Sequence, residues 1–279
     1  MSDLAGLRAL VTGASSGIGA AIARELAARG VHLVLTARRR DALDAIASEV
    51  SVHGARAGHP GLRADVIPAD LGRPGAASVL WMTATATGAI DIVVNNAGFG
   101  YFRAFTEVER TRDAELVQLN VTSLVELTRL FVDARKGKPG RGFILNIASI
   151  GAYQAVPNMA LYGASKAFVR NFTEALHDEL RGTPLSATCV CPGGTRTAFH
   201  AAAGAGDYSW IANASMTSAE NVARQAVHAM ARGKRNLITG FINKVSCFGV
   251  RLVPRAFASW RARRVLGKPT LTLPARSAA

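Results

Sequence analysis

The sequence predicts an α/β fold, in which a doubly wound parallel sheet forms a single domain that carries a helical extension at its C-terminus. Two observations support this fold class. Short apolar runs alternate along residues 7–192 with longer stretches whose apolar residues recur at helical spacing. The runs are continuous instead of alternating between apolar and polar residues, which is typical of parallel strands covered by helices on both faces. Regular alternation of strand and helix then favours a doubly wound sheet.

The elements follow one another in a regular order from the N-terminus. A strand at 7–12 runs directly into a glycine-rich turn, and a helix at about 17–29 leads to a second strand at 31–36. Further strands are expected at 63–68, 90–94, 142–148 and 186–191. Further helices are expected at 40–51, 73–87, 107–135, 160–181 and 218–232.

The C-terminal part differs from the rest in charge and in pattern. The chain has a formal net charge of +14, and residues 221–279 contain 12 Lys or Arg and no Asp or Glu. In a helical projection, Phe241, Val245, Phe248 and Leu252 share one face, and Pro254 is expected to kink or break the helix. Residues 241–279 are therefore predicted to form a basic amphipathic extension. Such a segment suits an anionic membrane surface, an acidic carrier or a subunit interface, and a packed terminal helix with solvated charges is the alternative.

Composition excludes several classes of protein. With 49% hydrophobic and 19% charged residues, the 279-residue chain has a globular composition. Three cysteines cannot form a disulfide framework, and Cys189 and Cys191 lie on an expected core strand. No signal peptide or spanning helix is expected, which predicts a cytoplasmic protein, with peripheral membrane contact as an alternative. The six histidines have no metal-ligand spacing, so no metal site is expected.

The glycine-rich turn is the first candidate binding site. Gly13, Gly17 and Gly19 lie between a strand and a helix, where backbone amides and the helix N-terminus can face a pyrophosphate. A tight strand-to-helix turn without a ligand is the alternative. The position of the turn in the first strand–helix–strand unit favours a dinucleotide.

Three consecutive arginines follow the second strand. Dinucleotide sites that bind the unphosphorylated cofactor place an acidic residue there, whereas an Arg accommodates a 2′-phosphate. This strand leads into Arg38, Arg39 and Arg40, and no acid precedes Asp41. Cations at a helix N-terminus are locally unfavourable, which favours a bound anion over a solvated helix start. The sequence therefore predicts NADP(H).

A third group of residues is suited to proton transfer. Tyr162 and Lys166 are four residues apart on an expected helix, so their side chains share one face. Among the four tyrosines, only Tyr162 has a Lys at this spacing. A free phenol titrates near pH 10, and a neighbouring ammonium group favours its ionised form. Ser149 follows an expected strand and joins them as a candidate.

Together these motifs resemble the short-chain dehydrogenase/reductase family, which has a Rossmann fold. The resemblance covers about residues 5–240, and the basic C-terminal extension resembles a subgroup described as uncharacterised oxidoreductases. The matching residues, in the family's order, are Thr12 to Gly19 (TGASSGIG), Asp70-Leu71, Asn95-Asn96-Ala97-Gly98, Asn120, Ser149, Tyr162, Lys166 and Pro192-Gly193.

The resemblance implies an oxidoreductase that moves a hydride between the nicotinamide and a carbonyl/alcohol substrate. Tyr162 would be the general acid/base, and Lys166 would also hold the nicotinamide ribose. Ser149 would bind the substrate oxygen, and Asn120 would anchor a water that links Lys166 to solvent. The implied cofactor-binding residues are Gly13, Ser15, Ser16, Gly17, Ile18, Gly19, Arg38, Arg39, Asp70, Leu71, Asn96, Ala97, Gly98, Tyr162, Lys166, Pro192, Gly193, Thr195 and Thr197.

The segment after Pro192-Gly193 departs from the family's pattern. It continues as Gly194-Thr195-Arg196-Thr197, so Thr195 takes the place of an apolar residue. Residues 1–240 are expected to form the catalytic domain, including a substrate loop at 196–216. The bulky residues of this loop, which favour a hydrophobic substrate, are Phe199, Tyr208 and Trp210.

Two further expectations concern partners and alternatives. The resemblance implies a homo-oligomer, a dimer or a tetramer, and no nucleic acid. The alternatives to an enzyme are a dinucleotide-binding sensor without turnover and a surface-docking protein.

Overall fold

The computed structural model describes residues 4–195 and 216–266. The described strands are β1 (Arg8–Thr12), β2 (His32–Thr36), β3 (Ala64–Val66), β4 (Ile92–Asn95), β5 (Gly142–Ile147), β6 (Leu185–Cys191) and β7 (Asn236–Ile238). The described α-helices are α1 (Gly17–Ala27), α2 (Arg40–Arg56), α3 (Ala76–Thr85), α4 (Arg110–Val117), α5 (Ser123–Arg135), α6 (Ala160–Glu179), α9 (Ala219–Ala231), α10 (Phe241–Gly249) and α11 (Arg255–Leu266). Short turns of helix are η1 (Phe105–Glu107), η2 (Gln118–Thr122), η3 (Ile150–Tyr153) and η4 (Val250–Leu252).

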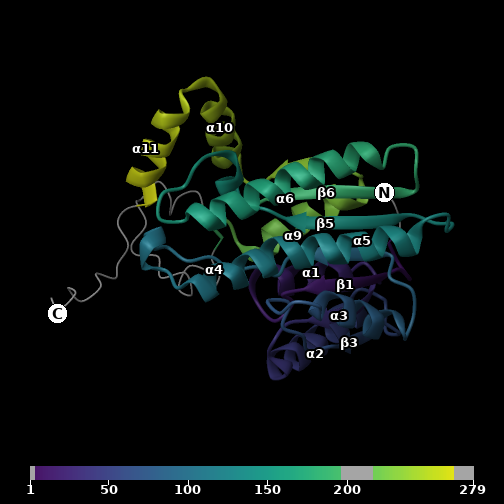
Figure 1. Ribbon diagram of the computed structural model, residues 1–279. Helices are drawn as coiled ribbons and strands as arrows, with labels where there is room; N and C mark the ends of the chain where they lie inside the picture. Colours follow the sequence, from purple (N-terminus) through teal and green to yellow (C-terminus); the bar gives the residue numbers. More distant parts are fainter. Residues whose placement is uncertain (1–3, 196–215, 267–279) are drawn as a thin grey trace, which may run out of the picture.

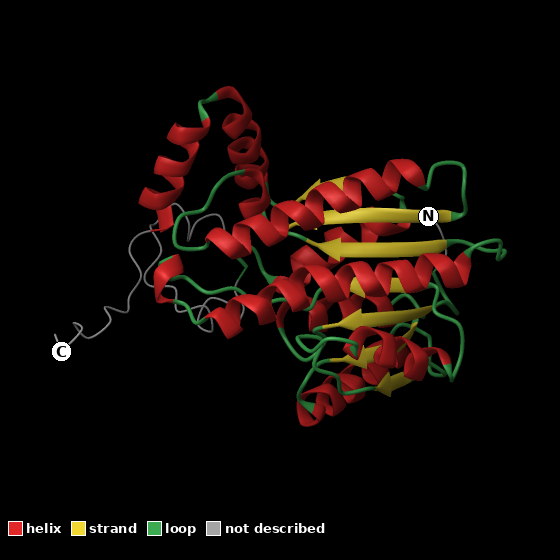
Figure 2. Ribbon diagram, viewed as in Figure 1, coloured by secondary structure: helices red, strands yellow, loops and turns green. Residues whose placement is uncertain are grey.

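The strands form one parallel sheet with the order β3-β2-β1-β4-β5-β6-β7. The order reverses between β1 and β4, since the chain first builds outward to β3 and then returns to the other side of β1. In open parallel sheets, ligands bind beyond the carboxyl ends of the strands at such a point. The predicted doubly wound α/β fold is confirmed. Figure 2 shows that the strand arrows point toward the side on which the last two helices lie.

The strands contain continuous apolar runs because a hydrophobic core lies on each face of the sheet. Along β1, Ala9 and Val11 pack against α1, α2 and α9, whereas Leu10 packs on the opposite side with α3 and α5. Successive side chains of a strand point to opposite faces, so a strand that is covered on both faces needs apolar residues at every position. Figure 1 shows α3, α5 and α6 as one layer over the sheet.

Three expectations about the elements needed correction. The strand β7 was not predicted, because its three residues are too few to show a pattern against the background of neighbouring polar positions. The helix expected from 107 begins at Arg110, after the single turn η1. Its course is also interrupted by η2, a five-residue π turn between α4 and α5. Such turns are frequent at functional sites.

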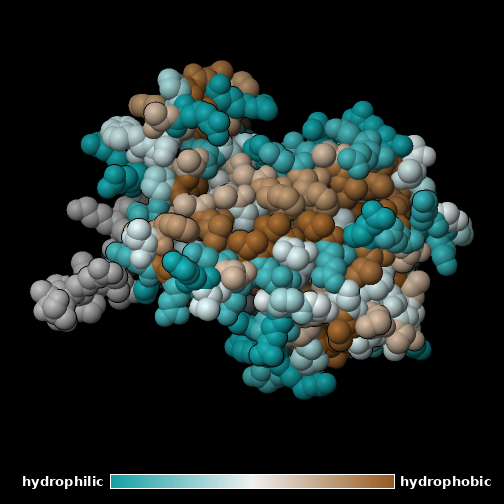
Figure 3. Space-filling model, viewed as in Figure 1, coloured by the Kyte–Doolittle hydropathy of each residue, from teal (hydrophilic) through white to brown (hydrophobic). Residues whose placement is uncertain are grey.

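The predicted break at Pro254 is confirmed, because α10 ends at Gly249 and α11 begins at Arg255. In Figure 1 these two helices stand together beyond the carboxyl ends of the strands. Their surface is mixed, with apolar patches beside hydrophilic ones (Figure 3). None of the described helices is both long enough and apolar enough to cross a membrane.

Candidate active site

A large cavity lies along the carboxyl edge of the sheet, with a volume of about 1260 Å³. Ligand sites commonly measure about 300–1,000 Å³, so this cavity can hold a dinucleotide together with a substrate. Most of the predicted site residues line it. They are Gly13, Ser15, Ser16, Gly17, Ile18, Arg38, Arg39, Asp70, Leu71, Asn96, Ala97, Gly98, Ser149, Tyr162, Lys166, Pro192, Gly193 and Thr195.

The glycine-rich turn is held by a side chain from another strand. Asn96, which directly follows β4, donates from Nδ2 to the carbonyl oxygens of Thr12 (3.0 Å) and Gly13 (3.2 Å). A Cβ at Gly19 would lie 2.2 Å from the Gly13 carbonyl oxygen and 2.4 Å from Asn96 Nδ2. Gly19 does not line the cavity. This position requires glycine because of the close packing, and not because a ligand approaches it. The turn thus forms a cradle of backbone groups at the start of α1, which fits a phosphate group.

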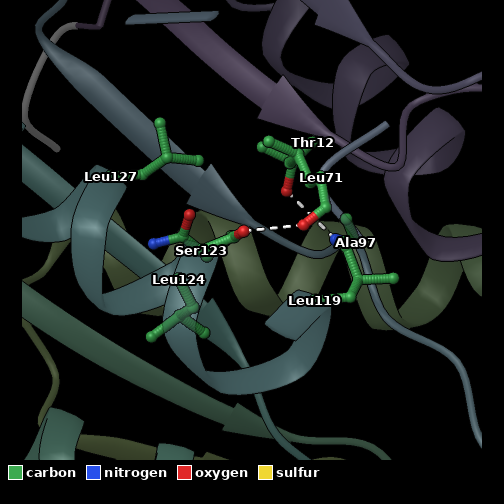
Figure 4. A pocket seen from close by; sticks show the side chains of 8 residues that line it. Thr12, Leu71, Ala97, Leu119, Ser123, Leu124 and Leu127 are labelled. Atoms are coloured by element: carbon green, nitrogen blue, oxygen red, sulfur yellow. Dashed lines mark hydrogen bonds between the residues drawn. The ribbon is translucent and has the colours of Figure 1, made fainter. Parts of the chain in front are cut away.

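The layer beneath this cradle is closely packed (Figure 4). Thr12 Oγ1 accepts hydrogen bonds from the backbone N–H of Asn96 and of Ala97, both at 3.0 Å. Ser123 Oγ donates to the Leu71 carbonyl oxygen at 2.7 Å. The cavity in this layer measures only about 10 Å³, roughly the volume that one water probe occupies. The segments that line the large cavity are therefore fixed to one another from below.

Two arginines mark the end of the cavity next to β2. Arg38 and Arg39 follow Thr36, and both are exposed and line the cavity. Neither forms an ion pair with any other residue in the described ranges. Asp70 lies at the same end, where its carboxylate accepts from the Gly72 N–H at 3.1 Å and lies 3.5 Å from Arg73. Free guanidinium groups beside the cradle fit a second phosphate.

Lys166 is the buried cation of the site. Its Nζ donates to the Ile147 carbonyl oxygen at 2.9 Å and lies 5.9 Å from the centre of the Tyr162 ring. Burial lowers the pKa of Lys166 from its ordinary value to about 8. The side chain is therefore mostly protonated at neutral pH, and its charge lies next to the phenol.

Ser149 and Tyr162 lie on two segments that face the same cavity. Ser149 follows β5 and caps η3, where its Oγ accepts from the Gly151 N–H at 3.1 Å. This bond uses a lone pair, so the hydroxyl hydrogen can donate to a substrate oxygen. Tyr162 is half-buried in the first turn of α6. The helix spacing of four residues brings Tyr162 and Lys166 to the same side, as expected.

Asn120 does not line the cavity. It is buried in the π turn η2, where Nδ2 donates to the Phe99 carbonyl oxygen (3.0 Å) and to Ser165 Oγ (3.1 Å). Its Oδ1 accepts from the Phe99 N–H at 3.1 Å. The side chain thus fixes the loop after β4 to α6, and a Cβ at Gly98 would lie 3.0 Å from Asn120 Oδ1 and 3.3 Å from Lys166 Nζ. The expected role in anchoring a water stays a prediction.

The last two helices also line the cavity, which the sequence did not reveal. The lining residues from this part of the chain are Phe241, Ile242, Asn243, Val245, Ser246, Arg261 and Ala262. Phe241 and Val245 belong to the apolar face that was expected either to dock on another surface or to pack as a terminal helix, and these two of its four residues line the cavity. The sequence did show an apolar helix face in this part of the chain. It could not show that this face lies at the cavity, because that position depends on the tertiary fold. Thr197, Phe199, Tyr208 and Trp210 lie outside the described residues.

The fold and the site together define a dinucleotide-binding α/β protein with a tyrosine and a lysine in its cavity. Comparison with known proteins agrees with this description. Residues 8–207 match the family model described as short chain dehydrogenase, and the chain belongs to this family. Membership in a family of dehydrogenases and reductases favours an enzyme over the alternative of a sensor without turnover.

The relatives with similar sequences include two reductases. The very-long-chain 3-oxoacyl-CoA reductase of Anas platyrhynchos is 33% identical over 192 residues, which cover 67% of this chain and 59% of the relative. The ketoacyl reductase HetN of Nostoc sp. is 33% identical over 194 residues, 69% of this chain and 65% of the relative. The chain therefore spans about three fifths of the length of these relatives. A solved short-chain dehydrogenase from Sphingobium yanoikuyae in complex with NADPH is 28% identical, with a TM-score of 0.74 over 88% of this chain and 94% of that chain.

Proposed function

We propose that this chain is an NADP(H)-dependent oxidoreductase that interconverts an apolar carbonyl compound and its alcohol, with Tyr162 as general acid/base. One observation carries the proposal. The glycine cradle, two arginines without ion-pair partners in the described ranges, and the pair Tyr162 and Lys166 all line one cavity. The cradle and the arginines fit a phosphorylated dinucleotide, and the pair supplies the proton transfer that accompanies a hydride transfer.

The proposed proton transfer uses three side chains. A bound NADPH supplies the hydride. Ser149 donates a hydrogen bond to the substrate oxygen and orients the carbonyl group. Tyr162 gives its phenolic proton to the same oxygen, and the Lys166 ammonium stabilises the tyrosinate that forms. In the oxidative direction, the tyrosinate removes the proton from the alcohol.

The preference for NADP(H) over NAD(H) is supported by Arg38 and Arg39. Both lie at the end of the cavity beside β2, where the adenosine ribose binds in folds of this topology. A guanidinium group donates two parallel hydrogen bonds to a phosphate. The 2′-hydroxyl of NAD(H) has a single oxygen and no charge, so it gains less from a neighbouring arginine. The relative from Sphingobium yanoikuyae was solved with NADPH, which agrees with this assignment.

The apolar substrate is supported by the wall of the cavity opposite the arginines. Side chains from three segments contribute there: Val156, Met159, Met216, Phe241, Ile242 and Val245. The order of the sheet separates this wall from the arginines, since β2 and β7 lie on opposite sides of the switch point. Two of the relatives are named as a very-long-chain 3-oxoacyl-CoA reductase and a ketoacyl reductase, which is consistent with a carbonyl substrate that carries an apolar chain.

The experiment that tests this function is a panel of ketones, aldehydes and alcohols, followed at the absorbance of NADPH. Apolar carbonyl compounds are expected to be reduced faster with NADPH than with NADH. If no carbonyl or alcohol in the panel is turned over, while NADPH binds, the chain is a binding protein and the proposal is wrong.

We also propose that the chain forms a homo-oligomer through the layer of α5 and α6. Figure 3 shows apolar surface over these helices. On α6, Phe168 is 41% exposed and stacks on Phe172 with 5.8 Å between the ring centres. Light scattering of the wild type and of Phe168→Asp tests this interface. If the interface forms through α5 and α6, the variant should have a smaller molecular mass in solution than the wild type.

A further inference from the structure

Arg261 is a cation at the wall of the cavity that the predicted site did not include. It lies on α11, and both it and its neighbour Ala262 line the cavity. Its Nη2 donates to Ser246 Oγ of α10 at 2.6 Å. The hydrogen bond joins the two helices and holds the guanidinium group beside the cavity.

The other cations of the cavity already have roles or partners. Lys166 is buried beside Tyr162, and Arg38 and Arg39 lie at the opposite end. Arg73 lies 3.5 Å from Asp70. Arg112 pairs with Glu115 at 2.8 Å, and its guanidinium group stacks 4.0 Å from the centre of the Phe99 ring.

Arg261 differs from these residues because, within the described part of the chain, its side chain donates a hydrogen bond only to the neutral hydroxyl of Ser246. Within residues 4–195 and 216–266, no carboxylate lies within ion-pair distance of it. A guanidinium group has five N–H donors, and one bond to Ser246 leaves most of them for another acceptor. On α10, the apolar residues Phe241, Ile242 and Val245 line the same cavity, together with the polar Asn243 and Ser246.

We propose that Arg261 is a specificity-determining residue, which binds an anionic group at the far end of an apolar carbonyl substrate. The inference rests on the proposed function and extends it by naming a substrate class. The substrate has a carbonyl group that reaches Tyr162, an apolar body against α10, and a carboxylate or phosphate that reaches Arg261. The guanidinium fork binds both kinds of anion by two parallel hydrogen bonds.

The test compares matched pairs of substrates that differ only in charge. Aldehydes that carry a carboxylate at the other end of an alkyl chain are compared with their methyl esters, over a series of chain lengths. The quantity measured is the ratio of kcat/KM for the acid to kcat/KM for the ester. Arg261→Met keeps most of the apolar stem and removes the charge, and Arg263→Met is the matched control. Arg263 is exposed on the same helix and does not line the cavity.

The wild type and Arg263→Met are expected to prefer the acid at one range of chain lengths. In Arg261→Met the preference should fall by about 10-fold, since a charge-assisted hydrogen bond is lost and the exposed position of Arg261 limits its strength. Arg261→Lys should keep part of the preference, because it keeps the charge without the planar fork. An equal ratio in the wild type, Arg261→Met and Arg263→Met would overturn the proposal.

A binding experiment separates this proposal from the proposed reaction. Saturated alkyl carboxylates and alkyl phosphates of the same lengths are titrated into the full chain loaded with NADP⁺, by calorimetry. Arg261→Met should weaken binding of the anionic ligands by about 10-fold relative to Arg263→Met. The stronger of the two ligand series identifies the anion. If the anions bind through Arg261 but no carbonyl is reduced, the proposed reaction is wrong and the binding site stands. If neither series distinguishes Arg261→Met from Arg263→Met, the anion site is wrong.

Discussion

Asn243 on α10 packs directly against Gly193, in the turn that follows β6. A Cβ at Gly193 would lie only 2.1 Å from Asn243 Nδ2. The Asn243 side chain is buried and donates to the Thr239 carbonyl oxygen at 2.9 Å. The contact joins Gly193, one of the residues expected to bind the cofactor, to α10, the first helix of the C-terminal part. The helix α10 is therefore attached to the wall of the cavity itself.

The first prediction uses this contact. Gly193→Ala should lower the free energy of unfolding by about 1–3 kcal/mol, because the added methyl group overpacks a rigid contact. Asn243→Ala alone should cost about 1 kcal/mol through the lost hydrogen bond to Thr239. The double variant Gly193→Ala/Asn243→Ala should be more stable than the sum of the single effects predicts. Urea unfolding of all four proteins measures this coupling, and strict additivity would show that the two residues do not share a contact.

The second prediction concerns the general acid/base. Tyr162→Phe keeps the ring and removes the transferable proton, so kcat should fall by roughly 10²- to 10⁴-fold. Binding of NADPH, measured by fluorescence titration, should persist. Tyr153→Phe is the control, because its hydroxyl bonds Asn236 at 3.3 Å and does not line the cavity. Turnover by Tyr162→Phe within a few fold of the wild type would assign the proton transfer to another group.

The third prediction concerns the choice of cofactor. Arg38→Ala should weaken NADPH binding by roughly 10- to 100-fold and leave NADH binding nearly unchanged, since only the 2′-phosphate loses its charge-assisted contact. Arg40→Ala is the matched control, because Arg40 is exposed in the first turn of α2 and does not line the cavity. Both cofactors are titrated against all three proteins. A loss of equal size for NADH and NADPH would mean that Arg38 does not distinguish them.

The residues that could be predicted share one property: local sequence determines where they lie. Gly17 opens a helix directly after a strand, and Lys166 follows Tyr162 by one helical turn, so their positions depend on a few neighbouring residues. The sequence therefore predicted most of the sheet and many of the residues that line the cavity.

The residues of the cavity that the sequence did not predict are placed there by tertiary contacts. Asn243 is a polar residue beside an apolar helix face, and nothing local indicates that it is buried against Gly193. Arg261 was one of several arginines in a basic segment, and only the packing of α11 on α10 places it at the cavity. Residues 241–279 were therefore predicted to form a separate extension, although α10 and α11 contribute to the wall of the cavity.

The last prediction follows from the burial of Lys166. Its pKa in the folded chain is about 8, below the ordinary value of 10.5, because burial disfavours the charged form. Between pH 8 and 10.5 the unfolded chain therefore binds more protons than the folded chain, so that stability rises with pH over this range. Below pH 8 the folded chain carries the full cost of the buried charge. At about 1.4 kcal/mol for each pKa unit, this cost is on the order of 3 kcal/mol.

Lys166→Met removes that charge and keeps the length of the side chain. The variant also loses the hydrogen bond to Ile147, worth about 1 kcal/mol, so the cofactor-free chain should gain about 1–2 kcal/mol in its free energy of unfolding at pH 7. The gain should shrink as the pH rises from 8 toward 10.5, because the wild-type lysine becomes neutral in both states. Urea unfolding of both proteins across this range measures the difference, and Tyr162→Phe serves as a variant of the same site that keeps the lysine. Parallel stability curves for the wild type and Lys166→Met would show that the lysine charge does not oppose folding.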